Sequence, residues 1–486
     1  MPAFATAPLA WSSDAAGLDH LPLWPVPPPG PLPDEAAPAG APYLWLKDLV
    51  LRAWALRQVD GPGCDALLDR AAPWLDEGQD GVHPDPDLRP LQRRWLVTRL
   101  SRRVLQVRHR ECEHLRGRLE ASRTDPGDLS ALDAALISTL YLWGCGCFDE
   151  AHAELARAEH CLSQLVDDAS RAHHVLLMRF LLVLGTGDTV ALQEWADRLQ
   201  ALYLHPDPAV RGIALRHMAS MAVAQEDVPR ALEFLENAAD LMEAGGDLQA
   251  AMWTRAETVA LYAQLGDHAH ALDIGLATLE RLRGLDWPFH TGFTLTRLGG
   301  IYASLGRHEV ALQSYREAHA LLATAPQKWL AAEARLGLGT ALHAQGRLDD
   351  ALEWLMAAHD VADPQRQRAL RLRTCLRGAW VLSDLGRATD ARDCLERVGR
   401  EAALETALPA EYLEVAALVM RAHPGLPPLH RLQGHDPLAL LLDHPGAAGR
   451  GLARAPVHDD IRVRCLDRLD RKSTRLNSSH SQQSRM

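Results

Sequence analysis

The chain has 486 residues, of which 47% are hydrophobic and 23% are charged, and a formal net charge of −12. This balance is that of a folded globular protein and excludes a wholly disordered chain, a collagen-like chain and a small disulfide scaffold. The acidic charge also argues against a general binder of nucleic acids or membrane surfaces, because phosphate groups attract basic surfaces. Ala and Leu outnumber Val and Ile, which favours helices over strands.

The sequence contains no sign of export or membrane insertion. The first basic residue is Lys47, so no basic segment precedes an apolar one as in a secretory signal. The longest apolar run, near 175–184, is interrupted by Arg179 and is shorter than the ~20 residues that span a bilayer. Eight cysteines in so long a chain form no disulfide framework. We therefore expect a cytoplasmic protein with reduced cysteines and no membrane partner.

The N-terminal region divides into an arm and a helical segment. Residues 21–42 hold nine of the thirty prolines and cannot pack as a helix, so residues 1–42 are predicted to be a disordered, Pro-rich segment. Residues 43–125 are predicted to form a helical N-terminal cap or degenerate repeats. Within them we expect a helical pair over 43–58 and 64–77 and one long amphipathic helix over 91–120.

A 40-residue repeat follows. Seven alanines are spaced by 40 residues each time, and glycines stand five residues before most of them, although the third copy has Glu226 there. Regular spacing without insertions indicates structural units that stack on their neighbours. The alanines are Ala151, Ala191, Ala231, Ala271, Ala311, Ala351 and Ala391, and the glycines are Gly146, Gly266, Gly306, Gly346 and Gly386.

Each repeat is predicted to be two helices. In the fifth copy, apolar residues fall at helical spacing over 291–305 and 309–322, and Gly306 ends the first helix because glycine adopts the left-handed conformation at little cost. Ala311 and Ala318 lie two turns apart on one face of the second helix. Tyr315 lies between them and is expected to fill the gap between neighbouring repeats.

These residues resemble the tetratricopeptide repeat (TPR) family. The pattern of that family is Leu-Gly, then an aromatic residue, then a glycine turn; an Ala, a Phe or Tyr, and a second Ala follow the turn. The matching residues here are Leu298, Gly299, Tyr302, Gly306, Ala311, Tyr315 and Ala318. The resemblance covers residues 126–405 and implies an all-α fold, a right-handed α-solenoid of antiparallel helix pairs. The usual TPR unit has 34 residues, so each pair here is longer. HEAT and armadillo repeats share the period but not this signature, whereas TPR-like arrays in the sensor regions of large bacterial transcription activators resemble it.

The sequence gives little support for catalysis or cofactor binding. It lacks the Walker-A phosphate-binding motif and the H-E-x-x-H motif. One group has metal-ligating side chains close in sequence, but without the paired spacing that zinc sites use: Cys145, Cys147, His152, His160 and Cys161. We expect inert cysteines, no bound metal, no cofactor and no enzymatic activity.

The TPR resemblance indicates where a partner would bind. In that family the first helix of each pair lines a concave groove, which accepts a protein or peptide. The family's groove positions correspond to Arg216, Trp253, Phe293, Thr296, Glu333, His343, Arg373 and Trp380. Some of these side chains could instead pack between repeats, because large aromatic residues are common in cores and in binding sites alike. The predicted function is a non-catalytic interaction scaffold that binds no nucleic acid, with its oligomeric state left open.

The C-terminal region does not continue the repeat. Residues 406–469 are predicted to be a degenerate repeat or C-terminal cap, with one helix over 409–423, next to a possible missing domain. Residues 470–486 resemble the translation of a short-read sequencing adapter and are expected to be a non-native tail. The alternative function follows from this: the array is the regulatory region of a longer bacterial regulator whose output domain is lost.

Overall fold

The computed structural model describes residues 42–76, 82–122, 128–165, 169–186, 202–225, 227–323, 328–362, 367–401 and 410–432, with the single residues 18, 23, 199, 325, 437 and 440. These residues form α-helices and a short 3₁₀ helix, and none of them lies in a strand. The all-α fold is therefore as predicted. The predictions for Ala191, Glu226, residues 470–486 and most of the N-terminal arm concern residues outside this set.

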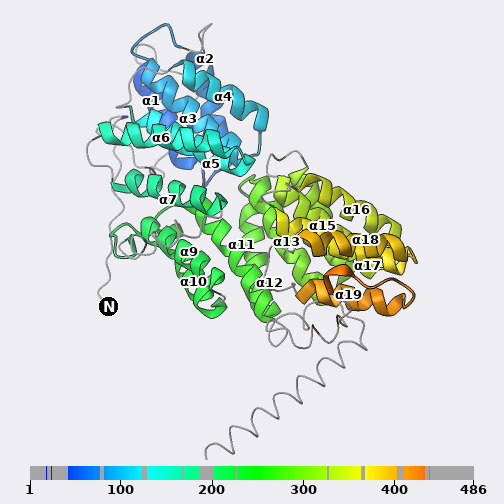
Figure 1. Ribbon diagram of the computed structural model, residues 1–486. Helices are drawn as coiled ribbons and strands as arrows, with labels where there is room; N and C mark the ends of the chain where they lie inside the picture. Colours follow the sequence, from blue (N-terminus) through cyan, green and yellow to red (C-terminus); the bar gives the residue numbers. More distant parts are fainter. Residues whose placement is uncertain are drawn as a thin grey trace, which may run out of the picture. The chain divides into compact units, whose positions relative to one another are not determined.

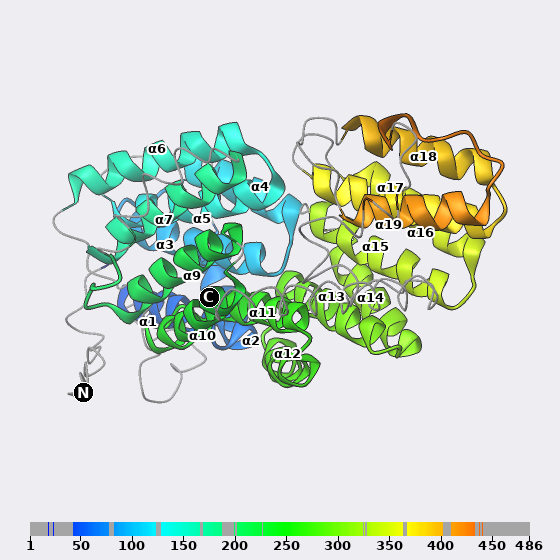
Figure 2. The ribbon, with the colours of Figure 1, turned by 60° about the horizontal axis from the view of Figure 1, so that its bottom comes forward.

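The helices follow one another along the chain as antiparallel pairs (Figures 1 and 2). The helices up to residue 283 are α1 (Pro42–Leu56), α2 (Gly61–Leu75), α3 (Arg89–Leu105), α4 (His109–Ala121), α5 (Leu129–Cys145), α6 (Phe148–Gln164), α7 (Ala169–Thr186), α9 (Pro208–Ala224), α10 (Val228–Ala244), α11 (Leu248–Leu265) and α12 (His268–Arg283). The later helices are α13 (Pro288–Ser304), α14 (His308–Leu322), α15 (Lys328–Ala344), α16 (Leu348–Val361), α17 (Arg368–Asp384), α18 (Ala388–Glu401), α19 (Ala410–Ala422) and the 3₁₀ helix η3 (His430–Leu432).

The chain forms two compact units. The first comprises Met1–Arg297 with Leu321–Gln327, and the second comprises Leu298–Ala320 with Lys328–Met486. In the first unit α3 packs against α1 and α5, and α7 packs against α5 and α9; in the second, α17 packs against α15 and α19. Neighbouring pairs thus contact one another through their first helices, and the second helix of a pair also packs against the first helix of the next, as α10 does against α11 and α16 against α17. The boundary between the units falls inside the fifth repeat, and the segment boundaries drawn from the sequence stay predictions.

The glycine and alanine positions of the repeat have the roles that their chemistry predicts. The five predicted turn glycines have φ between +72° and +81°, the left-handed region that residues with a Cβ rarely adopt. Each described alanine of the 40-residue series is fully buried in the first turn of a second helix. A methyl group at this point lets the second helix approach the first closely.

The predicted long helix over 91–120 is wrong. The chain instead forms α3 and α4, which are separated by a turn at Val107, where φ is +60°. A left-handed conformation is unfavourable for a β-branched residue. The turn is stabilised because it folds α4 back onto α3 and buries Cys112 and Leu115 in the core. Local amphipathic periodicity continues through the turn, so the sequence pattern does not reveal it.

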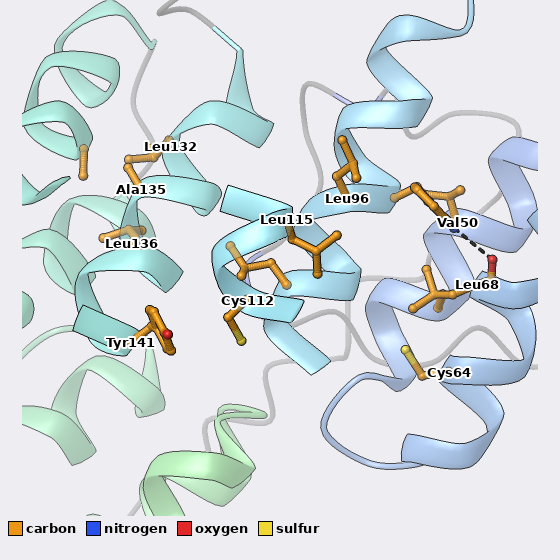
Figure 3. Packing of buried hydrophobic residues seen from close by; sticks show 14 of the residues in the cluster. Val50, Cys64, Leu68, Leu96, Cys112, Leu115, Leu132, Ala135, Leu136 and Tyr141 are labelled. Carbon is orange, nitrogen blue, oxygen red and sulfur yellow. Dashed lines mark hydrogen bonds between the residues drawn. The ribbon is translucent and has the colours of Figure 1, made fainter. Parts of the chain in front are cut away.

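Figure 3 shows how α4 contributes to the core of the first unit. Cys112 and Leu115 lie between Leu96 of α3 and Leu136 of α5, and all four side chains are at least 95% buried. On the adjoining side, the indole N–H of Trp95 donates to the carbonyl oxygen of Leu68 at 2.9 Å. The interior of this unit is therefore closely packed around α3.

A buried ionic network ties three first helices together. Asp133 of α5 accepts hydrogen bonds from Arg94 of α3, at 2.6 Å, and from Arg171 of α7, at 2.7 and 2.9 Å. All three side chains are at most 2% exposed. Burial alone would raise the pKa of Asp133, but the charges and hydrogen bonds of the two arginines outweigh burial and hold the pKa at about 2.

Tyr315 fills the gap between repeats as predicted. Its ring lies between Gly299 of α13 and Gly337 of α15, and it is 7% exposed. A Cβ atom added at Gly299 or Gly337 would lie 2.8 or 2.2 Å, respectively, from Tyr315 Cε1. Both glycines are therefore packing residues that admit the tyrosine.

Gly337→Ala is expected to lower the midpoint of urea unfolding, because the new methyl group overlaps the buried ring of Tyr315 and costs about 1–3 kcal/mol. The matched control is Gly378→Ala in helix α17, where an added Cβ meets nothing within 4 Å. That variant is expected to gain up to ~1 kcal/mol from helix propensity. Unfolding followed by circular dichroism separates the two, and equal midpoints for both variants would contradict the packing role.

Candidate functional site

The eight predicted groove residues fall into two sets, one in each unit, and every one lies on a first helix. The first set is carried by α9, α11 and α13 in the first unit, and consists of Arg216, Trp253, Phe293 and Thr296. The second set is carried by α15 and α17 in the second unit, and consists of Glu333, His343, Arg373 and Trp380.

Aromatic rings and guanidinium groups stack on one another in the first set. The indole of Trp253 lies nearly parallel to the rings of Phe293 and Phe289, with centroid distances of 4.4 and 5.3 Å. The Cζ atom of Arg297 lies 4.5 Å from the Phe293 ring, and that of Arg216 lies 5.8 Å from the Trp253 ring. These contacts join three consecutive first helices through stacking and cation–π interactions.

The polar groups of this set have hydrogen-bond partners within the first unit. Arg216 donates two hydrogen bonds of 3.1 Å to the carboxylate of Glu257, which also accepts the indole N–H of Trp253 at 2.7 Å. Thr296 is buried, and its hydroxyl donates to the carbonyl oxygen of Gly292. The set therefore stabilises the packing between helices, and a partner would have to compete with internal hydrogen bonds. Whether it binds a partner stays a prediction.

Helix α17 carries a second arginine close to Arg373, the arginine of the second set. Arg373 and Arg377 lie one turn apart on α17, and Trp380 follows them on the same face. Arg373 is exposed, Arg377 is half-buried, and its Cζ atom lies 5.4 Å from the Trp380 ring. Within the described parts of the chain, neither arginine has a hydrogen bond or an ion pair. We call Arg373, Arg377 and Trp380 the Arg–Trp strip.

His343 and Glu333, the other two residues of the second set, lie on α15, and His343 contacts the strip. The imidazole of His343 meets the Trp380 ring edge-on, at a centroid distance of 5.1 Å, and its Nε2 atom lies 2.8 Å from the carboxylate of Asp384. Glu333 is half-buried on the same helix as His343. The structure thus places all four predicted residues of this set on two helices that pack against each other.

A buried carboxyl group lies close to the strip. Glu414 of α19 is 5% exposed, and its Oε1 atom is buried without a hydrogen-bond partner among the residues described. Burial raises the pKa of Glu414 to about 7, and Glu411 adds to the rise while the charge of Arg377 opposes it. Burial likewise lowers the pKa of Arg377. Each charge is therefore only partly compensated by the other.

Two of these groups were not predicted from the sequence. Arg377 lies four residues after Arg373 and three before Trp380, so helical periodicity alone could have identified it. Glu414 follows the last repeat, and no sequence signal connects it with the strip. It approaches only because α19 packs against α17.

Three cysteines of the first unit have thiols that are hard to ionise. Burial raises the pKa of Cys64, Cys112 and Cys145 to about 12 in each case, which suppresses the reactive thiolate. Cys161 is also buried, whereas Cys147 is exposed at the turn between α5 and α6. Among the described residues, no three His, Cys, Asp or Glu side chains come together as metal ligands. In the same part of the chain, every helix is too short or too polar to cross a bilayer.

The comparisons with known proteins agree with the repeat pattern. A family model described as a tetratricopeptide repeat matches residues 294–319, which belong to the fifth repeat. Solved structures with the same arrangement of helices extend the likeness over most of the chain. The chain is a TPR-like repeat protein.

Two of the similar structures are assemblies. The Cut9–Hcn1 hetero-tetramer of the APC/C is 15% identical, with a TM-score of 0.58 over 89% of this chain and 79% of that chain. A Rap protein complexed with competence and sporulation factor is 13% identical, with a TM-score of 0.51 over 71% of this chain and 98% of that chain. At these identities the likeness shows the fold alone. No curated protein matches the TPR-like chain in sequence.

The buried carboxyl of Glu414 makes stability depend on pH. Its pKa is 4.5 in an unfolded chain and about 7 in the folded protein, so the folded state holds the proton more tightly. The free energy of unfolding is therefore highest below about pH 4.5. It falls by up to about 3 kcal/mol as the pH rises towards 7. Glu414→Gln is expected to remove this loss and to raise the unfolding midpoint at pH 8 relative to the parent.

The matched control for this prediction is Glu411→Gln, an exposed carboxylate on the same helix. It is expected to leave most of the pH dependence in place. Unfolding midpoints measured between pH 4.5 and 8 test both variants, and an unchanged slope in Glu414→Gln would show that this group does not titrate in that range.

Proposed function

We propose that this TPR-like chain is a non-catalytic, cytoplasmic scaffold that binds a protein or peptide, and that the Arg–Trp strip of α17 is a contact site. The supporting observation is that Arg373 and Arg377 carry guanidinium donors without an acceptor in the described residues, and that Arg377 lies beside the ring of Trp380. A guanidinium has five N–H donors and no acceptor, so a complementary ligand must supply oxygen atoms.

The strip favours a peptide with an acidic side chain next to an apolar one. Arginine binds carboxylates through two parallel hydrogen bonds, and backbone carbonyl groups are further acceptors. Trp380 adds apolar area that is only partly covered by its neighbours. Tryptophan and arginine are the residues that contribute most often to binding energy at protein interfaces. The stacked residues around Trp253 have fewer groups to offer, because Glu257 already satisfies them.

The similar structures support this proposal through what their titles name. The Rap structure contains competence and sporulation factor, and the Cut9 structure contains Hcn1. Each of those proteins holds a partner on a fold of this kind. The alternative hypothesis, a regulatory region that controls an output domain, would use the same binding face and differs only in what lies beyond the array.

Peptides selected from a random 12-residue phage library on the intact protein should bind more weakly to Arg373→Ala/Trp380→Ala. Loss of two such contacts is expected to reduce affinity at least ~10-fold, since each costs about 1 kcal/mol or more. Fluorescence anisotropy of the labelled peptides measures the change. Arg373→Glu, which alters an exposed side chain and spares the packing of Trp380, should have an effect in the same direction.

Arg316→Ala is the matched control. Arg316 is exposed on α14, the second helix of its pair, and makes no ion pair among the described residues. This variant should bind like the parent. A selection that yields no binding peptide, or peptides with equal affinity for the strip variants and the parent, argues against the proposed function.

A further inference from the structure

A buried carboxyl group lies where α19 packs against α17, the helix of the Arg–Trp strip (Figures 1 and 2). Glu414 of α19 is 5% exposed, and its Oε1 atom has no hydrogen-bond partner among the described residues. The positive charge of Arg377 acts on this carboxyl group. No ion pair of the described residues joins the two side chains. Glu414 and Arg377 are therefore neighbours that interact through their charges without being bonded.

Arg377 lies against an aromatic ring instead. Its Cζ atom is 5.4 Å from the Trp380 ring, and a cation–π contact at a partly exposed position is weak. A buried carboxylate, in contrast, is costly unless a cation pairs with it. An ionised Glu414 would therefore draw Arg377 away from the ring, whereas a protonated Glu414 would leave Arg377 in place. The Arg377 side chain thus has two alternative partners on neighbouring helices.

The other charged groups around Glu414 do not take this role. Glu411 lies one turn before it on α19 and opposes its ionisation. On α18, which also packs against α19, Arg392 is paired with Glu396. Among the charged side chains that the structure describes, Arg377 is the one that favours the ionised form of Glu414. The charge state of Glu414 therefore bears on a single arginine of the strip.

Histidines commonly change charge between pH 5 and 8, so those on the surrounding helices have to be distinguished from Glu414. His343 of α15 contacts the Trp380 ring, and its Nε2 atom lies 2.8 Å from the Asp384 carboxylate. His423 of α19 lies with its Nε2 atom 3.2 Å from a backbone carbonyl oxygen of α17. Neither histidine contributes to the shift of the pKa of Glu414.

We propose that Glu414 is a positioning residue for Arg377 and makes the binding of an acidic peptide to the Arg–Trp strip depend on pH; this inference rests on the proposed function of the strip. Ionised Glu414 holds Arg377 and competes with the carboxylate of the peptide. Protonated Glu414 leaves Arg377 available, together with Arg373. Binding of an acidic peptide is therefore linked to uptake of a proton at Glu414 and is tightest below neutral pH.

The expected size of the effect follows from the titration of Glu414. Burial raises its pKa to about 7, so the carboxyl group is mostly protonated at pH 6 and mostly ionised at pH 8. If the ionised form keeps the peptide from Arg377, the dissociation constant rises about 10-fold between these two pH values. Asp and Glu residues of the peptide stay ionised over the same range, so the peptide itself adds no pH dependence.

The probe is a 12-residue peptide selected on the full chain that contains Asp or Glu, lacks histidine and is weakened by Arg373→Glu. Fluorescence anisotropy measures its dissociation constant at pH 6 and pH 8 at one ionic strength. The parent should show the ~10-fold ratio. Glu414→Gln keeps the shape of the side chain but cannot ionise, so its ratio should be near one and it should bind more tightly than the parent at pH 8. Glu411→Gln is the matched control and should keep the ratio of the parent.

Two further variants identify the group that titrates. Arg377→Gln should also bring the ratio near one, because Glu414 acts through Arg377, and this variant tests the proposal independently of any effect of Glu414→Gln on folding. His343→Gln should keep the ratio. A ratio that persists in Glu414→Gln and Arg377→Gln, or that is lost in His343→Gln, would overturn the proposal. Equal binding of a strip-dependent peptide to the parent at both pH values overturns this inference alone, whereas failure to select any strip-dependent peptide overturns the proposed function with it.

Discussion

The close approach of neighbouring helices depends on positions where side chains are small or absent. The alanine in the first turn of each described second helix is fully buried, and glycines at 299 and 337 make room for the ring of Tyr315. Protein interiors are packed so tightly that one additional methyl group changes the stability of the fold. Because the same small residues recur every 40 positions, successive pairs stack in the same manner, and first helices come to lie beside first helices. Every site discussed above is built on those first helices.

The arginines around Trp253 and Asp133 differ from those of the Arg–Trp strip in whether they have a bonded carboxylate. Around Trp253 and around Asp133, arginines of the first unit are bonded to carboxylates within the same unit. Such pairs add to stability only when both partners are present, since a single buried charge is costly. In the second unit Arg373 and Arg377 lack a bonded partner among the described residues, and Glu414 is buried with a raised pKa. A surface that leaves strong donors unsatisfied is suited to a ligand, and this contrast favours α17 over α11 as the contact site.

The sequence by itself determined the helix pairs, because the 40-residue spacing of alanine and glycine is a local signal that each repeat carries independently. It also placed Tyr315 between repeats, and the TPR resemblance named Arg373 and Trp380 among the groove positions. Only the tertiary structure decided which polar groups satisfy one another: Arg216 with Glu257, Asp133 with two arginines, and Glu414 beside Arg377. These partners lie 37 to 41 residues apart and on different helices, and their pairing follows from how the helices pack. The turn at Val107 was missed for the same reason, since it is stabilised by the packing of α4 against other helices.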